Sequence, residues 1–210
     1  MKRIITISRE FGSGGRELGK RLADVIGFDY YDQEIITAIA QQSGMSSEYI
    51  ENKLNQQSWL HAPLTFRSTF SSLNYAQSDK VNLLLTQKQV IEQIAAHGRD
   101  CIIVGRNADI ILQQYRPFSI FVCADMQAKL KRCIERAPEG EKLNEKDMLK
   151  KIRQIDKVRA HTREIMADSA WGDCHSFKMT VNTTDWDIKQ LACAIAPFAM
   201  SWFEKDNTGE

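Results

Sequence analysis

Residues 4–23 read IITISREFGSGGRELGKRLA and decide the fold. Residues 4–7 are a short run rich in β-branched side chains, which is typical of a strand buried on both faces of a parallel sheet. Residues 12–15 read GSGG, and three glycines in four positions let the backbone turn sharply and direct N–H groups at an anion. An amphipathic helix follows, so its positive N-terminus faces the turn. The stretch predicts a phosphate-binding strand, turn and helix; a glycine turn without a ligand is the alternative.

The turn departs from the usual phosphate-loop pattern G-x-x-x-x-G-K-[ST]. With Gly15 on the second glycine, Arg16 stands at the lysine position and Glu17 at the hydroxyl position. With Gly14 there instead, those two positions fall on Gly15 and Arg16. Arg16 can supply the missing cation, because its planar guanidinium suits bidentate phosphate binding. Glu17 either ligates magnesium through its carboxylate or complements the helix dipole as a first-turn acid.

The composition favours one α/β domain, since 210 residues are enough to bury a substantial core. The 28 basic and 27 acidic residues nearly cancel, which argues against nucleic acid or an anionic membrane as a partner. The start MKRIITISRE reads as neither a signal peptide nor a spanning helix. The five cysteines are scattered without a C-x-x-C pair, which predicts reduced, mostly buried thiols in a cytoplasmic protein and argues against a zinc site.

The rest of the chain alternates between strand and helix patterns. Apolar runs predict further strands at residues 28–31, 101–104, 118–123 and 178–181. Helical spacing predicts helices within residues 35–39, 43–53, 81–97, 107–112, 126–136, 145–163 and 186–196. Residues 56–79 have no clear period and predict a mobile insertion, Pro197 is expected to end or kink the last helix, and residues after 204 are expected to be disordered.

Several charged residues stand at the ends of the predicted elements. Arg106 follows the strand at 101–104, where ligands of open α/β sheets bind, so substrate binding is favoured over a structural ion pair. Asp32 either caps the next helix or contacts substrate, whereas Asp125 is most simply an N-cap. Asp109 is interpreted as a helix-dipole partner, and Arg67 as solvent-exposed or as a clamp on a second phosphate.

The segment 145–163 is rich in arginine. Its apolar residues recur at helical spacing, while Arg153, Arg159 and Arg163 project elsewhere. A solvated amphipathic helix is one interpretation; the other is a helix that folds over a phosphate site and neutralises its charge. Asp156 is spaced to position Arg153 or Arg159 by i±3 pairing.

The alternation of strand and helix patterns along the chain predicts the α/β class, with a parallel β-sheet covered by helices on both faces. Over nearly its whole length the sequence resembles the cytidylate kinase-like family, relatives of the nucleoside monophosphate kinases with a P-loop NTPase fold. The resemblance rests on ITISREFGSGGRELG, YYDQEII, IIVGRNADIIL, IRQIDKVRAHTRE and WGDCHSFKMTVNTTD, which together are specific for the family. It implies a single kinase-like domain, with a core of residues 1–32, 80–137 and 164–204, a monophosphate-binding helical insertion at 33–79 and a lid at 138–163.

The resemblance also implies roles for individual residues. The predicted ATP-binding residues are Gly12, Ser13, Gly14, Gly15, Arg16 and Glu17. The residues expected to face the acceptor nucleotide are Asp32, Arg67 and Arg106. The residues expected to supply catalytic charge are Arg16 and the lid arginines Arg153, Arg159 and Arg163.

The implied reaction is transfer of the ATP γ-phosphoryl group to a nucleoside monophosphate, CMP or dCMP first, with magnesium. Two alternatives remain open at this point. One is a nucleotide-binding sensor without turnover, because the loop lacks its lysine and hydroxyl residue and Val104 stands directly before Gly105 and Arg106 where an acidic residue is often found. The other is a kinase for a small metabolite that is not a nucleotide. The apolar tail at 197–203 either covers the core or joins a homodimer.

Overall fold

The computed structural model describes residues 2–48, 50, 70–137 and 143–208. Five strands form one sheet in the order β2-β3-β1-β4-β5, and every neighbouring pair is parallel. The strands are β1 (Ile4–Arg9), β2 (Asp29–Tyr31), β3 (Cys101–Val104), β4 (Phe118–Cys123) and β5 (Met179–Asn182). The predicted parallel α/β fold is therefore confirmed, with β1 two residues longer than its apolar run suggested.

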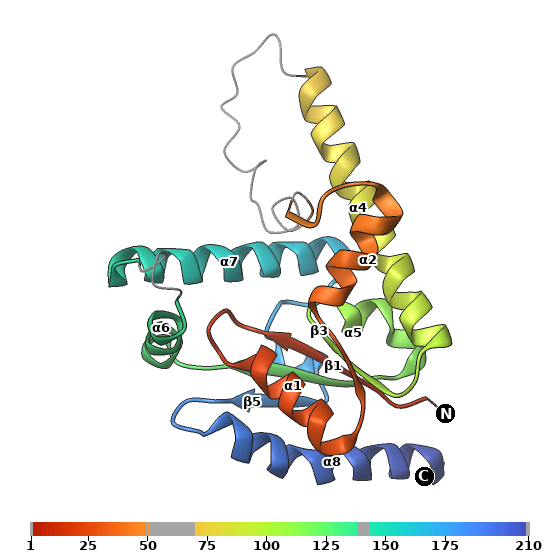
Figure 1. Cartoon of the computed structure of the whole chain (residues 1–210), viewed down its shortest axis with the longest axis vertical. Coiled ribbons are helices and arrows are strands. Elements are labelled where there is room, and N and C mark those ends of the chain that lie inside the picture. Colours follow the sequence, from red (N-terminus) through yellow and green to blue (C-terminus); the bar gives the residue numbers. More distant parts are fainter. Residues whose placement is uncertain (1, 49, 51–69, 138–142, 209–210) are drawn as a thin grey trace.

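Helices cover both faces of the sheet (Figure 1). Helices α1 (Gly15–Ile26) and α8 (Ile188–Thr208) pack on one face, against Ile5 and Ile7 of β1. Helices α2 (Gln33–Ser43), α4 (Phe70–His97) and α5 (Ala108–Ile111) pack on the other, against Ile4. Successive β1 side chains thus enter opposite cores, because side chains alternate across a strand.

Two further helices lie beyond the carboxyl ends of the strands. Helices α6 (Met126–Glu135) and α7 (Glu145–Met166) pack on each other around Leu130, Met148 and Ile152. Short 3-10 helices occur at Gln113–Tyr115 and Cys174–Ser176. In the part of the chain that the structure describes, none of the helices combines the length and the apolar character needed to cross a bilayer.

The last helix does not end at Pro197 but continues to Thr208, so the expectation that it ends there was wrong, as was that of disorder for residues 205–208. The expected kink at Pro197 stays a prediction, and residues 209 and 210 lie outside the described part of the chain. A proline in a helix interior costs one backbone hydrogen bond. Here, Ala199 and Phe203 beyond it are buried, and the Phe203 ring lies edge-on to Phe118 with centroids 6.4 Å apart. Burial of this turn therefore offsets the lost bond, and the apolar tail covers the core.

Helix α4 begins at Phe70, eleven residues before its predicted start. The expectation of an irregular insertion was therefore wrong for residues 70–79, and the earlier part of that insertion lies outside the described residues. No glycine or proline interrupts residues 70–97, so a helix nucleated by the buried residues Leu83, Val90 and Ile91 can extend toward its N-terminus at little cost.

The five cysteines are free thiols, but only Cys101 is buried, so the expectation of mostly buried thiols was wrong. Burial raises the pKa of the Cys101 thiol to about 11. Cys174 and Cys193 are exposed. Cys193 lies on the outer side of α8, whose residues Ala192, Ile195 and Ala196 face the sheet.

Asp125 caps helix α6, as predicted: its carboxylate accepts a hydrogen bond of 2.7 Å from the backbone N–H of Ala128. Replacing Asp125 with alanine is expected to lower the free energy of unfolding by about 1 kcal/mol, the usual contribution of such a cap. Urea unfolding measures the change. The exposed Asp24→Ala variant serves as a control, and an equal loss in both variants would contradict the capping role.

Candidate active site

The glycine-rich turn joins β1 to α1 at the carboxyl edge of the sheet, as predicted. Gly12 and Gly14 have φ angles of 79° and 82°, a left-handed conformation that favours glycine. A Cβ atom on Gly12 would lie 2.8 Å from Cys133 Sγ and 2.9 Å from the carbonyl oxygen of Lys129. The turn is therefore closely packed against α6 and needs glycine for space as well as for conformation.

Ser13 supports this turn from below. Its side chain is fully buried and donates a hydrogen bond of 2.8 Å to the carbonyl of Glu10. Its own carbonyl accepts a hydrogen bond of 2.6 Å from Thr183 Oγ1. Ser13 does not line the neighbouring cavity, so its hydroxyl holds the turn in shape, whereas the flanking Gly12, Gly14 and Gly15 border the cavity.

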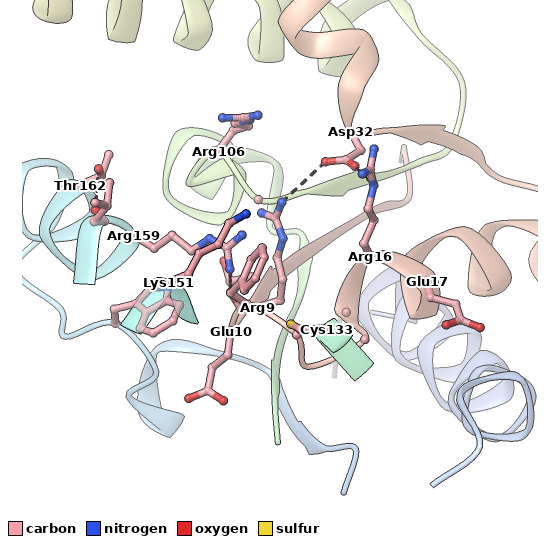
Figure 2. A pocket seen from close by; sticks show the side chains of 18 of the residues that line it. Arg9, Glu10, Arg16, Glu17, Asp32, Arg106, Cys133, Lys151, Arg159 and Thr162 are labelled. Atoms are coloured by element: carbon pink, nitrogen blue, oxygen red, sulfur yellow. Dashed lines mark hydrogen bonds and ion pairs between the residues drawn. The ribbon is translucent and has the colours of Figure 1, made fainter. Parts of the chain in front are cut away.

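A cavity of about 530 Å³ opens over this turn, between α1, α4, α6 and α7. Its charged lining residues are Arg9, Arg16, Arg106, Arg132, Arg136, Lys151, Arg159, Glu10, Glu17 and Asp32. Figure 2 shows Arg9 between Arg16 and Arg159, with Arg106 above them, while the side chains of Glu10 and Glu17 point away. The space is therefore strongly cationic, as a site for phosphate groups needs to be.

Asp32 is the carboxylate that faces these arginines. It is buried, and its two oxygens lie 2.5 Å from Arg16 Nε and 3.6 Å from Arg9 Nη2. Asp32 stands at the N-cap position of α2 but makes no capping hydrogen bond. The capping interpretation was therefore wrong, since the two guanidinium groups draw the carboxylate toward the cavity.

Glu17 pairs with arginines on its outer side. Arg21 Nε lies 2.7 Å from one oxygen, and Arg136 Nη2 contacts the other. Burial alone would raise the pKa of Glu17, but the hydrogen bonds from Arg21 and Arg136 hold it below the ordinary value. Glu17 does lie in the first turn of α1, as the dipole interpretation expects, and it also connects that turn to α6.

Arg106 lies where the sequence placed it, directly beyond β3. Gly105, Arg106 and Asn107 all have positive φ angles, of 75°, 60° and 52°. Two of these residues are not glycine, and such strained backbone concentrates at functional sites. The buried Gln87 of α4 donates a hydrogen bond of 3.0 Å to the Arg106 carbonyl and holds the turn.

Among the predicted lid arginines, Arg159 reaches the cavity. Its Nη1 donates hydrogen bonds to the Arg9 carbonyl at 3.0 Å and to Asp156 at 3.4 Å, which confirms the predicted i±3 pairing of Asp156. Burial, with a further contribution from the nearby charge of Arg9, lowers the pKa of Arg159 to about 9. The Arg159 cation is therefore stabilised by any anion that enters the cavity.

The structure places the other predicted arginines elsewhere. Arg153 is exposed and does not line the cavity. Arg163 is buried, and its Nη1 lies 2.7 Å from Asp109 Oδ2. Asp109 does lie in the first turn of α5, as the dipole interpretation expects, and it is also the buried ion-pair partner of Arg163. Arg163 does not line the cavity. Arg67 lies outside the described residues.

Sequence reasoning missed a network under the turn. Lys129 is buried and bridges Glu10 at 3.1 Å and Asp156 at 3.3 Å. Asp156 also accepts a hydrogen bond of 2.7 Å from the backbone N–H of Phe11. Arg9 was missed as well, although it ends a strand at the edge where α/β proteins bind ligands, and that position was a usable signal.

The cavity residues do not fit a magnesium site built by the protein. The three lining carboxylates Glu10, Glu17 and Asp32 each pair with a lysine or arginine, and the turn lacks the hydroxyl residue of a phosphate loop. Magnesium prefers uncommitted oxygen ligands. Within the described part of the chain, the lining offers charge neutralisation by arginine instead.

The parallel sheet, the glycine turn and the arginines above it define a protein with the fold of the P-loop kinases. The profile of the cytidylate kinase-like family matches residues 4–185, and the chain belongs to this family. No match was found among curated proteins. Family and fold together support a phosphotransferase.

Solved structures share the fold. An uncharacterized protein from Eubacterium ventriosum has a TM-score of 0.67 at 24% identity, over 95% of this chain and 99% of that one. Shikimate kinase from Bacteroides thetaiotaomicron has a TM-score of 0.56 at 11% identity, and the match covers 94% of this chain and 98% of that one. Shikimate kinase from Acinetobacter baumannii, in complex with shikimate, has a TM-score of 0.51 at 15% identity, and the match covers 96% of this chain and 94% of that one. At these identities the likeness concerns the fold alone.

Proposed function

We propose that the protein transfers the γ-phosphoryl group of ATP to a nucleoside monophosphate, with CMP or dCMP as the first acceptor to test. The observation that carries the proposal is that Arg9, Arg16, Arg106 and Arg159 all line one cavity above the glycine turn (Figure 2). A triphosphate and a monophosphate together bring several negative charges into such a site, and guanidinium groups bind phosphate with bidentate geometry. The choice of cytidine rests on membership of the cytidylate kinase-like family.

The cavity divides into two sides. The ATP phosphates would bind along Gly12–Gly15 and the N-terminus of α1, where Arg16 stands. The acceptor phosphate would bind near Arg106, beyond β3, with α2 and α4 beside it. Arg159 of α7 lines the same cavity and would neutralise charge on the group in transfer. Positioning and charge neutralisation are the main requirements of phosphoryl transfer, so the chemistry needs no general base on the protein.

A second candidate is a nucleotide-binding protein without turnover on the same fold. It is favoured by the ion pairs of the turn: Arg16 is held by Asp32 and Glu17 is held by Arg21 and Arg136, so neither is free to replace the usual lysine and hydroxyl group without rearranging. A third candidate, a kinase for a small metabolite, uses the same cationic cavity with another acceptor.

The test is ADP release from ATP and magnesium against a panel of ribo- and deoxynucleoside monophosphates and phosphorylatable small metabolites. Arg106→Ala is expected to lower kcat/KM for the acceptor about 30-fold, because one charged phosphate contact is lost. Arg99→Ala is the matched control, since Arg99 is 86% exposed and precedes β3 at the opposite edge of the sheet.

Each outcome separates the candidates. Release that prefers CMP or dCMP and falls in Arg106→Ala but not in Arg99→Ala supports the proposal. Release with a metabolite and with no monophosphate establishes the third candidate. Nucleotide binding without release in any mixture establishes the second.

A further inference from the structure

Arg9 is the last residue of β1, and its side chain lies across the carboxyl end of β3. The backbone N–H of Gly105 donates a hydrogen bond of 2.8 Å to the carbonyl of Ile7, which brings the two strand ends together. A Cβ atom on Gly105 would overlap the Arg9 guanidinium. The absence of a side chain at residue 105 therefore leaves the space that this guanidinium fills at the floor of the cavity.

The Arg9 guanidinium is poorly compensated where it lies. Its side chain is 17% exposed, and among the described residues Asp32 alone is a carboxylate within ion-pair distance, at 3.6 Å. Arg16 holds the same carboxylate at 2.5 Å, so two cations share one anion. Burial lowers the pKa of Arg9, with Asp32 opposing this effect and Arg16 adding to it.

The third guanidinium comes from the opposite side. Arg159 of α7 donates a hydrogen bond to the Arg9 backbone carbonyl at 3.0 Å, so its position is fixed relative to Arg9 itself. Figure 2 shows Arg9 between Arg16 and Arg159, with its guanidinium directed into the shared space. Burying like charges together costs stability, and such groups are retained where function needs them.

We infer that Arg9 is a catalytic residue that contacts the transferring phosphoryl group, between Arg16 on the ATP side and Arg159 on α7. This inference rests on the proposed phosphotransferase function. It assigns to Arg9 the role of the lysine that the glycine turn lacks. The usual lysine reaches the phosphates from the helix side. Arg9 reaches the same space from the end of β1, and Gly105 makes room for it. A dianionic phosphate there would satisfy guanidinium donors that Asp32 leaves incompletely paired.

The test measures anion binding and stability without requiring an acceptor. Inorganic tripolyphosphate and ATP are titrated into wild-type protein, Arg9→Met and Arg9→Lys by calorimetry, with Arg99→Met as the control. Arg9→Met is expected to bind tripolyphosphate roughly 30-fold more weakly, as loss of a charged hydrogen-bonding group predicts, and Arg9→Lys to recover part of the affinity. The Tm of the ligand-free Arg9→Met protein is expected to rise by about 2–4 °C, because a buried, under-paired cation is removed.

A structural role for Arg9 predicts the opposite change in stability. Unchanged tripolyphosphate affinity in Arg9→Met, or a lower Tm with affinity retained, would overturn the inference while the proposed function stands. Weaker binding in Arg9→Met, together with no ADP release by wild-type protein, would reject the kinase and overturn the catalytic role, and would leave Arg9 as a phosphate-binding residue of a protein without turnover. Wild-type protein that binds neither tripolyphosphate nor ATP would overturn both.

Discussion

Replacing Asp109 with alanine is expected to lower the free energy of unfolding by about 3–5 kcal/mol, the usual cost of leaving one partner of a buried ion pair uncompensated. The side chains of Arg163 and Asp109 are 2% and 5% exposed, and Arg163 Nη1 lies 2.7 Å from the carboxylate. The Arg163 guanidinium also lies over the Phe177 ring, 4.8 Å from its centroid, and donates to Ser169 Oγ at 3.2 Å. Neither contact replaces the lost carboxylate. Urea unfolding followed by circular dichroism measures the change.

The double variant Asp109→Ala/Arg163→Met is the control for this mechanism. It removes both charges and keeps an apolar side chain of similar length, so most of the lost stability is expected to return. If the double variant is no more stable than Asp109→Ala, packing rather than charge explains the loss. A loss below about 1 kcal/mol in Asp109→Ala would contradict the buried pair itself.

The sheet and the phosphate turn could be predicted because their signals are local. The apolar run of β1, the glycines at residues 12–15 and the periodic face of α1 are contiguous, and each follows from backbone geometry or burial. The place of Arg106 was also predictable, since parallel strands end at a common edge. The same rule applied to Arg9 would have found it, but the run of apolar residues stops at Ile7 and hid the true end of the strand.

The ion pairs were not predictable, because they join residues far apart in the sequence. Lys129 and Glu10 are 119 residues apart in the sequence, and Arg163 and Asp109 are 54 residues apart. A charge pattern on one helix shows which faces are polar, but the partner is set by tertiary packing. Arg153, Arg159 and Arg163 read alike in sequence, yet one is exposed, one lines the cavity and one is buried in the core.

The network beneath the turn links α7 to phosphate binding. Asp156 accepts from the backbone of Phe11 and from Lys129, while Arg159, one turn further along α7, holds the Arg9 carbonyl. Movement of α7 would therefore shift the glycine turn and Arg9 together. Anion binding and the position of α7 are expected to be coupled through these contacts.

Replacing Arg16 with alanine is expected to lower kcat/KM for ATP about 10²- to 10³-fold, if the protein is a kinase and Arg16 replaces the lysine of the phosphate loop. The guanidinium lies at the first turn of α1 with its side chain 67% exposed, so it can leave Asp32 for a phosphate without a core rearrangement. Because a ligand competes with Asp32 for Arg16, the loss is expected in ATP affinity as well as in kcat. Calorimetry and initial rates separate the two.

Lys20→Ala is the matched control for Arg16→Ala, because Lys20 is an exposed cation one turn further along the same helix and does not line the cavity. A general electrostatic effect would weaken ATP binding in both variants and would diminish with salt. A specific contact affects Arg16→Ala alone, and Arg16→Lys would recover only part of the affinity, since a lysine loses the bidentate geometry. Unchanged ATP affinity in Arg16→Ala would show that Arg16 serves to hold Asp32, and would leave Arg9 and Arg159 as the cations available to the phosphates.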